Sequence, residues 1–192
     1  MRHLICSIGL VAAASPALAA CPVAADMERG LRLGLATGEV EEVTRGTAEG
    51  ETRSRFIVEG YVSEVRLGQG VFPLEVREEE NGTEVATPTT YRYATPLPAP
   101  APGLEVSLEL VVEGDETRQE RHDYSFGTPV TWTYGSCAYE VIPVRTVHFR
   151  DGTEVSRDSL HYLVAFGHSY LAGYSDGESE DVYTYVSVEA MP

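Results

Sequence analysis

Hydrophobic and polar residues alternate with a period of two along most of this chain. The clearest example is segment 104–112, where every second residue is Leu or Val and the residues between them are mostly Glu and Ser. Segments 31–35 and 61–67 alternate in the same way. Such a pattern is typical of strands with one face on a core and the other in water. Since no helical stripe of comparable length exists, the pattern predicts a mainly antiparallel β protein.

Pairs of turn residues separate the alternating segments. Asn81-Gly82, Asp151-Gly152 and Asp176-Gly177 tolerate the positive φ values of two-residue hairpins, and Glu113-Gly114-Asp115 is a fourth candidate. Segment 23–29 predicts one short N-terminal helix that ends at Gly30. The remaining segments predict about nine to eleven strands, arranged as an antiparallel sandwich or a curved, partly open barrel.

The first twenty residues have the features of an export signal. Arg2 and His3 precede an apolar run over 4–14, which is too short to span a bilayer, and small residues follow Pro16. We therefore predict a signal peptide over 1–20, a single secreted β domain over 21–192, no transmembrane segment, and a periplasmic or secreted location. Segment 95–103 has proline at alternate positions and is expected to be an extended surface connection within that domain.

The charge balance narrows the possible partners. The chain has 14 basic and 30 acidic residues, for a formal net charge of -16. Such a surface repels nucleic acid and anionic membranes, so neither is an expected partner. All the basic residues are arginine, and the absence of lysine excludes Schiff-base chemistry.

Two alternatives compete for Cys21. Cys6 lies in the predicted signal peptide, which leaves Cys21 and Cys137 in the mature chain. In an oxidising compartment an even pair favours a disulfide between them. Alternatively, segment 18–21 (Leu-Ala-Ala-Cys) resembles a bacterial lipobox, with a lipid anchor on Cys21 and a free Cys137. Because Pro22 and the expected helix leave no polar tether behind such an anchor, we favour the disulfide.

No motif in the sequence assembles a catalytic or metal site. Ser136 lies in Tyr-Gly-Ser-Cys-Ala, which lacks the second glycine of a nucleophile elbow. His122 and Asp123 are neighbours on a predicted strand and therefore point to opposite faces. The acidic loop 176–181 lacks the ligand pattern of a calcium-binding loop and is interpreted as a solvated hairpin tip. The spacing of the four mature histidines does not match a zinc site: His122, His148, His161 and His168. We therefore expect a non-enzymatic protein without a cofactor or metal.

Aromatic residues are the remaining candidates for binding. Of the eleven tyrosines, all but Tyr61 lie at or after Tyr91. Two aromatic pairs each share a strand face and are the candidate ligand-binding residues: Trp132 with Tyr134, and Tyr162 with Phe166. The alternative interpretation is that they are core residues whose polar ends reach the rim of the sheet.

Segment 135–144, the Asp151-Gly152 hairpin and the aromatic run 162–174 together resemble uncharacterised secreted proteins of Gram-negative bacteria. The order of a short helix followed by a curved sheet is also similar to periplasmic half-barrel proteins that carry lipid or lipoprotein. These resemblances imply secretion and a β fold, and they transfer no site residue.

These observations predict a periplasmic, non-enzymatic β domain that binds a small apolar or aromatic ligand, or another envelope protein, through one sheet face. The alternative is a hydrolase of envelope polymers that uses two carboxylates about 5 to 10 Å apart, since such a pair needs no sequence motif.

Overall fold

A computed structural model of the chain describes residues 20–192, so the predicted signal peptide lies, apart from its last residue, outside the described residues. Within 20–192, no helix is both long and apolar enough to span a membrane. The described chain is mainly β, and its only helical element is the 3-10 turn η1 (Ala24–Glu28). The strands are β1 (Leu31–Leu35), β2 (Val40–Arg45), β3 (Thr52–Val58), β4 (Tyr61–Gly68), β5 (Phe72–Glu80), β6 (Thr83–Glu84), β7 (Thr89–Tyr93), β8 (Glu105–Glu113), β9 (Thr117–Phe126), β10 (Val130–Tyr134), β11 (Cys137–Arg150), β12 (Thr153–Leu163), β13 (His168–Ser175), β14 (Glu180–Val182) and β15 (Tyr185–Ala190).

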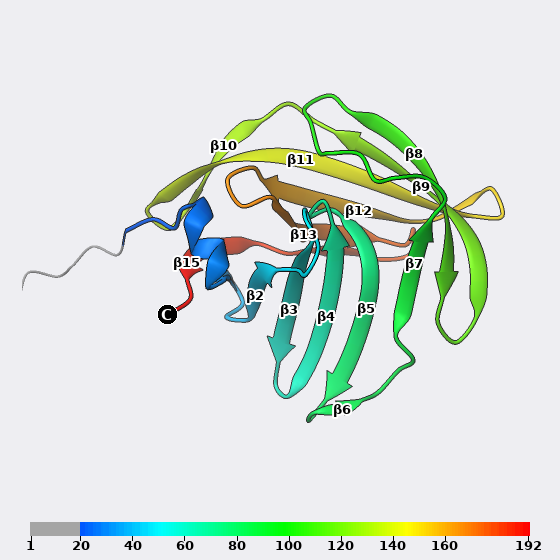
Figure 1. Ribbon diagram of the computed structural model, residues 1–192, viewed down its shortest axis with the longest axis horizontal. Coiled ribbons are helices and arrows are strands. Elements are labelled where there is room, and N and C mark those ends of the chain that lie inside the picture. The colour runs from blue at the N-terminus through cyan, green and yellow to red at the C-terminus, as the bar shows by residue number, and fades with distance from the viewer. Residues whose placement is uncertain (1–19) are drawn as a thin grey trace, which may run out of the picture.

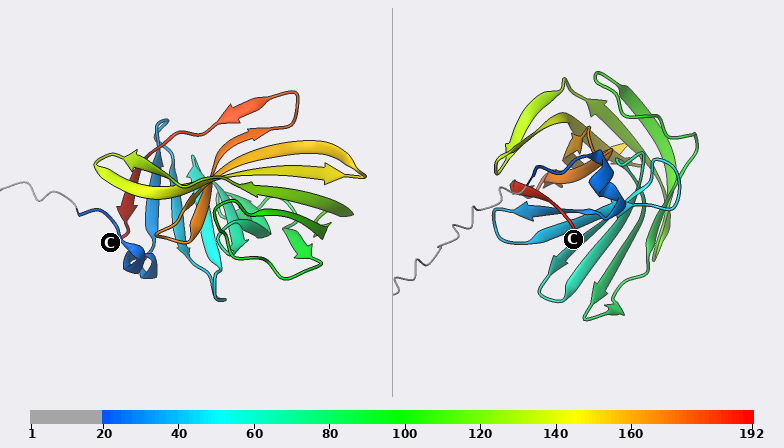
Figure 2. Two further views of the ribbon diagram at one scale, coloured as in Figure 1. Left: turned by 90° about the horizontal axis from the view of Figure 1, so that it is seen from above. Right: turned by 60° about the vertical axis from the view of Figure 1, so that its left-hand side comes forward.

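All these strands form one antiparallel sheet in the order β14-β13-β12-β11-β9-β8-β7-β5-β4-β3-β2-β1-β15. Two strands lie off this path, because β10 pairs with β11 and β6 pairs with β5. The sheet is open and strongly curved, so that β11, β12 and β13 run across the strands β2 to β5 (Figure 1). A second view shows the strands curling into an incomplete ring (Figure 2). The fold confirms the predicted mainly β class with a curved, partly open sheet.

Two of the predicted hairpin turns and two of the three alternating segments, 31–35 and 104–112, recur in the structure. Segment 61–67 is half-buried on both faces along most of β4, and the chain around Asp176-Gly177 forms a longer loop between the paired residues Ser175 and Glu180. Asn81-Gly82 and Asp151-Gly152 have positive φ at both residues. Strand β8 buries alternate residues, as segment 104–112 predicts. Segment 95–103 contains no strand or helix. The prediction of nine to eleven strands is wrong, since the described residues contain fifteen; short strands such as β6 and β14 have no readable period.

The two halves of strand β11 bury opposite faces, so β11 contributes residues to two apolar clusters. In the first half, Cys137, Tyr139 and Val141 are buried in a cluster with residues of η1, β1, β2, β13 and β15. In the second half, Ile142 and Val144 are buried in a second cluster, with residues that include Phe72 and Phe126. Successive side chains of a strand point to opposite faces, so the change from odd to even buried positions changes the face that is covered. The curved sheet thus has apolar packing on both sides of β11 and β12.

A disulfide between Cys21 and Cys137 ties the N-terminal segment to the start of β11. Next to it, the Tyr139 hydroxyl donates a hydrogen bond of 3.0 Å to the Pro22 carbonyl, and Met27 of η1 is buried. The structure therefore agrees with the first alternative for Cys21, whose sulfur is bonded to Cys137. The helix expected over 23–29 is a 3-10 turn over Ala24–Glu28. The chain leaves it at Gly30, whose φ of 105° suits glycine.

Candidate functional site

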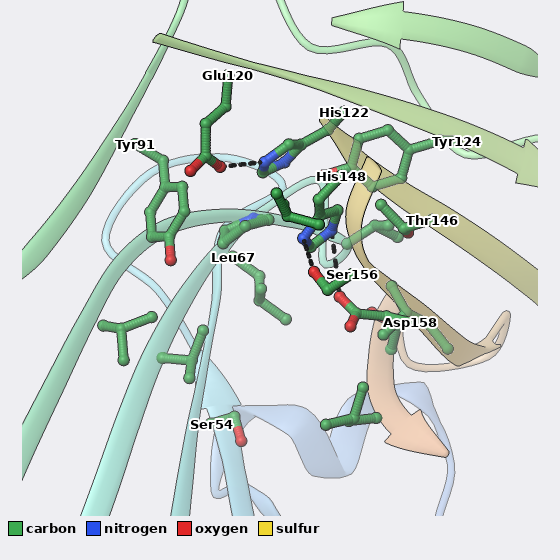
Figure 3. A pocket seen from close by; sticks show the side chains of 18 of the residues that line it. Ser54, Leu67, Tyr91, Glu120, His122, Tyr124, Thr146, His148, Ser156 and Asp158 are labelled. Carbon is green, nitrogen blue, oxygen red and sulfur yellow. Dashed lines mark hydrogen bonds and ion pairs between the residues drawn. The ribbon is translucent and has the colours of Figure 1, made fainter. Parts of the chain in front are cut away.

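A cavity of about 400 Å³ lies between strands β2 to β5 on one side and β9, β11 and β12 on the other. One wall is apolar and comes from β4, β5 and the turn between them, with additions from β12 and β13: Val65, Leu67, Val71, Pro73, Val76, Leu160 and Leu171. The opposite wall carries imidazole, hydroxyl and carboxylate groups from β9, β11 and β12 (Figure 3). The cavity is therefore amphiphilic.

Two histidines stack at the centre of the polar wall. The antiparallel register of β9 and β11 places His148 directly opposite His122. Their rings lie 4.0 Å apart between centroids and are nearly parallel, with an interplanar angle of 14°. Burial lowers the pKa of both imidazoles, because a desolvated imidazolium is less stable than the neutral ring. Both rings are therefore neutral at pH 7.

Glu120 binds His122, the histidine on β9. Its carboxylate accepts a hydrogen bond of 2.9 Å from His122 Nε2 and one of 2.5 Å from Arg118 Nε. Arg150 Nη2 lies 3.3 Å from the same carboxylate. Burial alone raises the pKa of Glu120, but the hydrogen bonds from His122 and Arg118 outweigh it and lower the pKa to about 2. Glu120 is thus ionised and surrounded by donors.

His148, the histidine on β11, contacts two side chains of β12. The register pairs His148 with Ser156, and the Ser156 hydroxyl lies 3.2 Å from His148 Nδ1. Asp158 is two residues further along the same strand and faces the same side. Its Oδ2 atom lies 3.3 Å from His148 Nε2. Burial raises the pKa of Asp158, although His148 acts in the opposite direction.

Three polar atoms in this wall have no hydrogen-bond partner among residues 20–192. They are His122 Nδ1, Thr146 Oγ1 and the Tyr124 hydroxyl oxygen, and the three residues are at most 3% exposed. A buried polar atom without a partner destabilises a fold by about 1 to 3 kcal/mol. Such atoms point to a role for the cavity, since a polar group of a ligand can satisfy them.

A second polar group lies at the floor of the cavity. The buried carboxylate of Glu41 accepts a hydrogen bond of 2.5 Å from the Tyr185 hydroxyl and another from the Ser54 hydroxyl. His168 Nε2 lies 3.6 Å from Glu41, and His168 Nδ1 lies 2.9 Å from the Thr52 hydroxyl. Burial raises the pKa of Glu41, but these partners outweigh it and leave that pKa lowered. Glu41 is therefore an ionised group inside the fold.

The aromatic residues singled out from the sequence do not line this cavity. Tyr134 and Phe166 come together in the apolar cluster beside the disulfide. Tyr162 packs against the second cluster. Trp132 is 38% exposed, and its ring lies 4.0 Å from that of His161, edge to face. The structure thus separates the members of both predicted pairs: Tyr134 is buried while Trp132 is exposed, and Phe166 lies in the turn after β12, in a different cluster from Tyr162. Their ligand-binding role stays a prediction.

Sequence reasoning missed the stacked histidines, because it compared their spacing only with metal sites. Among the described residues, no group of three or more His, Cys, Asp or Glu side chains is arranged to hold a metal ion. One signal for the site was present: a hairpin at Asp151-Gly152 brings the residues before it opposite those after it. That signal places His148 near Val155 and Ser156, and a bulge between His148 and Phe149 sets Ser156 directly opposite His148. It does not find His122.

The comparisons with known proteins leave the chain without a family. No protein-family model matches the sequence, and no curated protein matches it significantly. Among solved structures, the fold is similar to that of the hypothetical lipoprotein YmcC from Escherichia coli K12, with a TM-score of 0.46 and 12% sequence identity. The match covers 84% of this chain and 87% of that one.

Proposed function

We propose that this protein is a β domain of the cell envelope that binds a small, uncharged, amphiphilic ligand in the cavity. The observation that carries this proposal is the pairing of an apolar wall with three buried, unpartnered polar atoms, His122 Nδ1, Thr146 Oγ1 and the Tyr124 hydroxyl oxygen. The envelope location is supported by the Cys21–Cys137 disulfide, which persists in oxidising compartments.

The size and charge of the cavity define the ligand class. A volume of about 400 Å³ falls within the usual range for small-molecule sites, about 300 to 1,000 Å³. Two of the carboxylates that line it already accept hydrogen bonds from the protein: Glu120 from His122 and Arg118, and Glu41 from Tyr185 and Ser54. These contacts support an uncharged ligand. An aromatic ring or short acyl chain with a hydroxyl, amide or ester group fits both walls.

The other functions expected from the sequence have less support. A protein partner requires an exposed face, whereas the unpartnered atoms lie inside the cavity. A two-carboxylate hydrolase requires two carboxylates that are free to act on a substrate. Of the three carboxylates that line the cavity, Glu120 accepts hydrogen bonds from His122 and Arg118 and Glu41 from Tyr185 and Ser54. This leaves only Asp158. We therefore favour small-ligand binding.

A fluorescent probe tests this proposal. The uncharged dye 1-N-phenylnaphthylamine has a naphthyl and a phenyl group joined by one N–H group, and its emission rises in apolar surroundings. We expect saturable binding to the wild-type protein. Val76→Phe narrows the apolar wall and is expected to weaken binding at least about tenfold, as expected for the loss of about 1.4 kcal/mol of binding free energy.

Val182→Phe is the matched control, because it makes the same change on β14 at a side chain that is 74% exposed. This variant is expected to bind the dye like the wild type. Absence of saturable binding, or equal weakening in both variants, would contradict the cavity as the binding site.

A further inference from the structure

We propose that Ser156, His148 and Asp158 form a nucleophile, a general base and a positioning carboxylate that cleave an ester bound in the cavity. This inference rests on the proposed ligand binding and adds a reaction to it. The three side chains line the cavity together and face one another (Figure 3).

The distances match those of an activated serine. Ser156 Oγ lies 3.2 Å from His148 Nδ1, and His148 Nε2 lies 3.3 Å from Asp158 Oδ2. Catalytic hydrogen bonds are often this long before substrate binds. When Nε2 carries the proton toward Asp158, Nδ1 keeps its lone pair toward the serine hydroxyl. One tautomer therefore satisfies both contacts.

The scaffold holds these groups without a flexible loop. Ser156 and Asp158 lie two residues apart on β12, opposite His148 on the adjacent strand β11. The ring of His122 covers one face of the His148 ring at 4.0 Å, and Glu120 fixes His122 in turn. Groups held on paired strands are better ordered than groups on loops.

Ser156, His148 and Asp158 are accessible from the cavity, and this distinguishes them from a similar group of three residues nearby. Thr52, His168 and Glu41 also place a hydroxyl, an imidazole and a carboxylate in a row. However, Thr52 is 3% and His168 is 1% exposed, and neither lines the cavity. That set is structural. The His148 and Asp158 side chains are 19% and 20% exposed, so a ligand in the cavity can reach the Ser156 set.

The reaction balances as an acyl transfer. Ser156 Oγ attacks the ester carbonyl carbon while its proton moves to His148 Nδ1, and the carbonyl π electrons move onto oxygen. Collapse of this tetrahedral species restores the C=O bond, breaks the bond to the alcohol oxygen and returns the proton from His148 to that oxygen. Water then attacks the acyl-serine by the same sequence and releases a carboxylic acid.

Two other side chains assist this reaction. Thr146 has a hydroxyl without a partner in the described chain and lies two residues before His148 on the same face of β11. Its hydroxyl is the donor that we assign to the oxyanion. Asp158 acts through His148, because its carboxylate stabilises the transient imidazolium. The apolar wall selects the acyl group, so the substrate class is an uncharged ester with a short apolar acyl chain.

Covalent labelling of the intact mature protein tests the nucleophile. We expect a fluorophosphonate to add once, at Ser156, and p-nitrophenyl butyrate to be hydrolysed. Ser156→Ala is expected to abolish the label and to lower kcat by about 100-fold or more. Ser159→Ala is the matched control, because Ser159 lies on the same strand but is exposed on its other face. It is expected to react like the wild type.

The pH dependence of kcat tests the roles of His148 and Asp158. Because His148 must be neutral to accept the proton, kcat is expected to fall on the acid side below pH 6.5. His148→Gln is expected to remove this limb together with most of the rate. Asp158→Asn is expected to lower kcat and to move the limb to lower pH, because an imidazolium without the carboxylate loses its proton more readily. A purely structural role for Asp158 would leave the limb in place.

Dye binding separates this inference from the proposed function. If the wild type and Ser156→Ala both bind 1-N-phenylnaphthylamine but the wild type is neither labelled nor active, the triad is overturned and cavity binding stands. A label on another serine overturns it as well. If the wild type does not bind the dye, the proposed function also fails. Bound dye and an unchanged circular dichroism spectrum show that Ser156→Ala is folded.

Discussion

The two halves of strand β11 lie in different surroundings. Its first half, from Cys137 to Val141, lies in an apolar cluster beside the disulfide. Its second half continues toward the cavity, where Thr146 is buried without a partner and His148 stacks on His122. The first half adds stability through burial and a covalent link. The second half leaves polar groups unsatisfied, and such groups are common where a protein binds or reacts.

The largest expected effect on stability comes from the disulfide in the first half of β11. We predict that Cys137→Ala lowers the free energy of unfolding by about 2 to 5 kcal/mol without abolishing the sheet, because the disulfide closes a long loop of the unfolded chain. The sequence separation of its two cysteines is 116 residues. Urea unfolding measures the loss, and circular dichroism shows that the sheet remains. Ser136→Ala changes the adjacent residue and is expected to have little effect.

Mass spectrometry of the mature protein under non-reducing conditions checks the bond itself. The disulfide predicts a mass two hydrogens below that of the reduced chain. A diacylglyceryl group on Cys21, or two free thiols, would contradict it, and the first result would establish the lipid-anchor alternative.

A pair of reciprocal substitutions on one face of β11 tests whether its second half changes from apolar packing at Val144 to an unsatisfied polar group at Thr146. Thr146→Val removes a buried hydroxyl without a partner and is expected to raise the free energy of unfolding by about 1 kcal/mol. Val144→Thr places such a hydroxyl in the apolar cluster and is expected to lower it by about 1 to 3 kcal/mol. Both side chains are nearly inaccessible, at 1% and 2% exposed. Equal destabilisation by the two changes would remove the contrast.

The sequence predicts the sheet better than the cavity, for a physical reason. Turn residues such as Asn81-Gly82 act locally, and the alternation over 104–112 needs no knowledge of its neighbours. The stack of His122 on His148 depends on β9 pairing with β11, and β10 intervenes between them along the chain. The sequence pairs Trp132 with Tyr134 and Tyr162 with Phe166. It does not predict that Tyr134 and Phe166 are buried in one cluster, because that cluster also needs residues of η1 and β15.

The smallest expected effect on stability comes from His161, which lies next to the apolar cluster of the first half of β11. His161 Nδ1 lies 3.1 Å from the Tyr170 hydroxyl, and burial lowers the pKa of His161 to about 4. The unfolded chain binds a proton at this histidine near pH 6.5, whereas the folded chain does so only near pH 4. Between these values the unfolded state binds more protons, so stability falls as the pH falls.

We predict that His161→Gln reduces the stability lost between pH 7 and pH 5 by about 1 kcal/mol; the full shift would give more, but partial exposure of the ring screens it. Glutamine can still hydrogen-bond Tyr170, so the difference isolates the titration. Urea unfolding of both proteins at pH 7, 6 and 5 measures it. His122 and His148 titrate in both proteins and cancel in the comparison. Parallel loss of stability in the wild type and the variant would show that His161 is not held neutral by the fold.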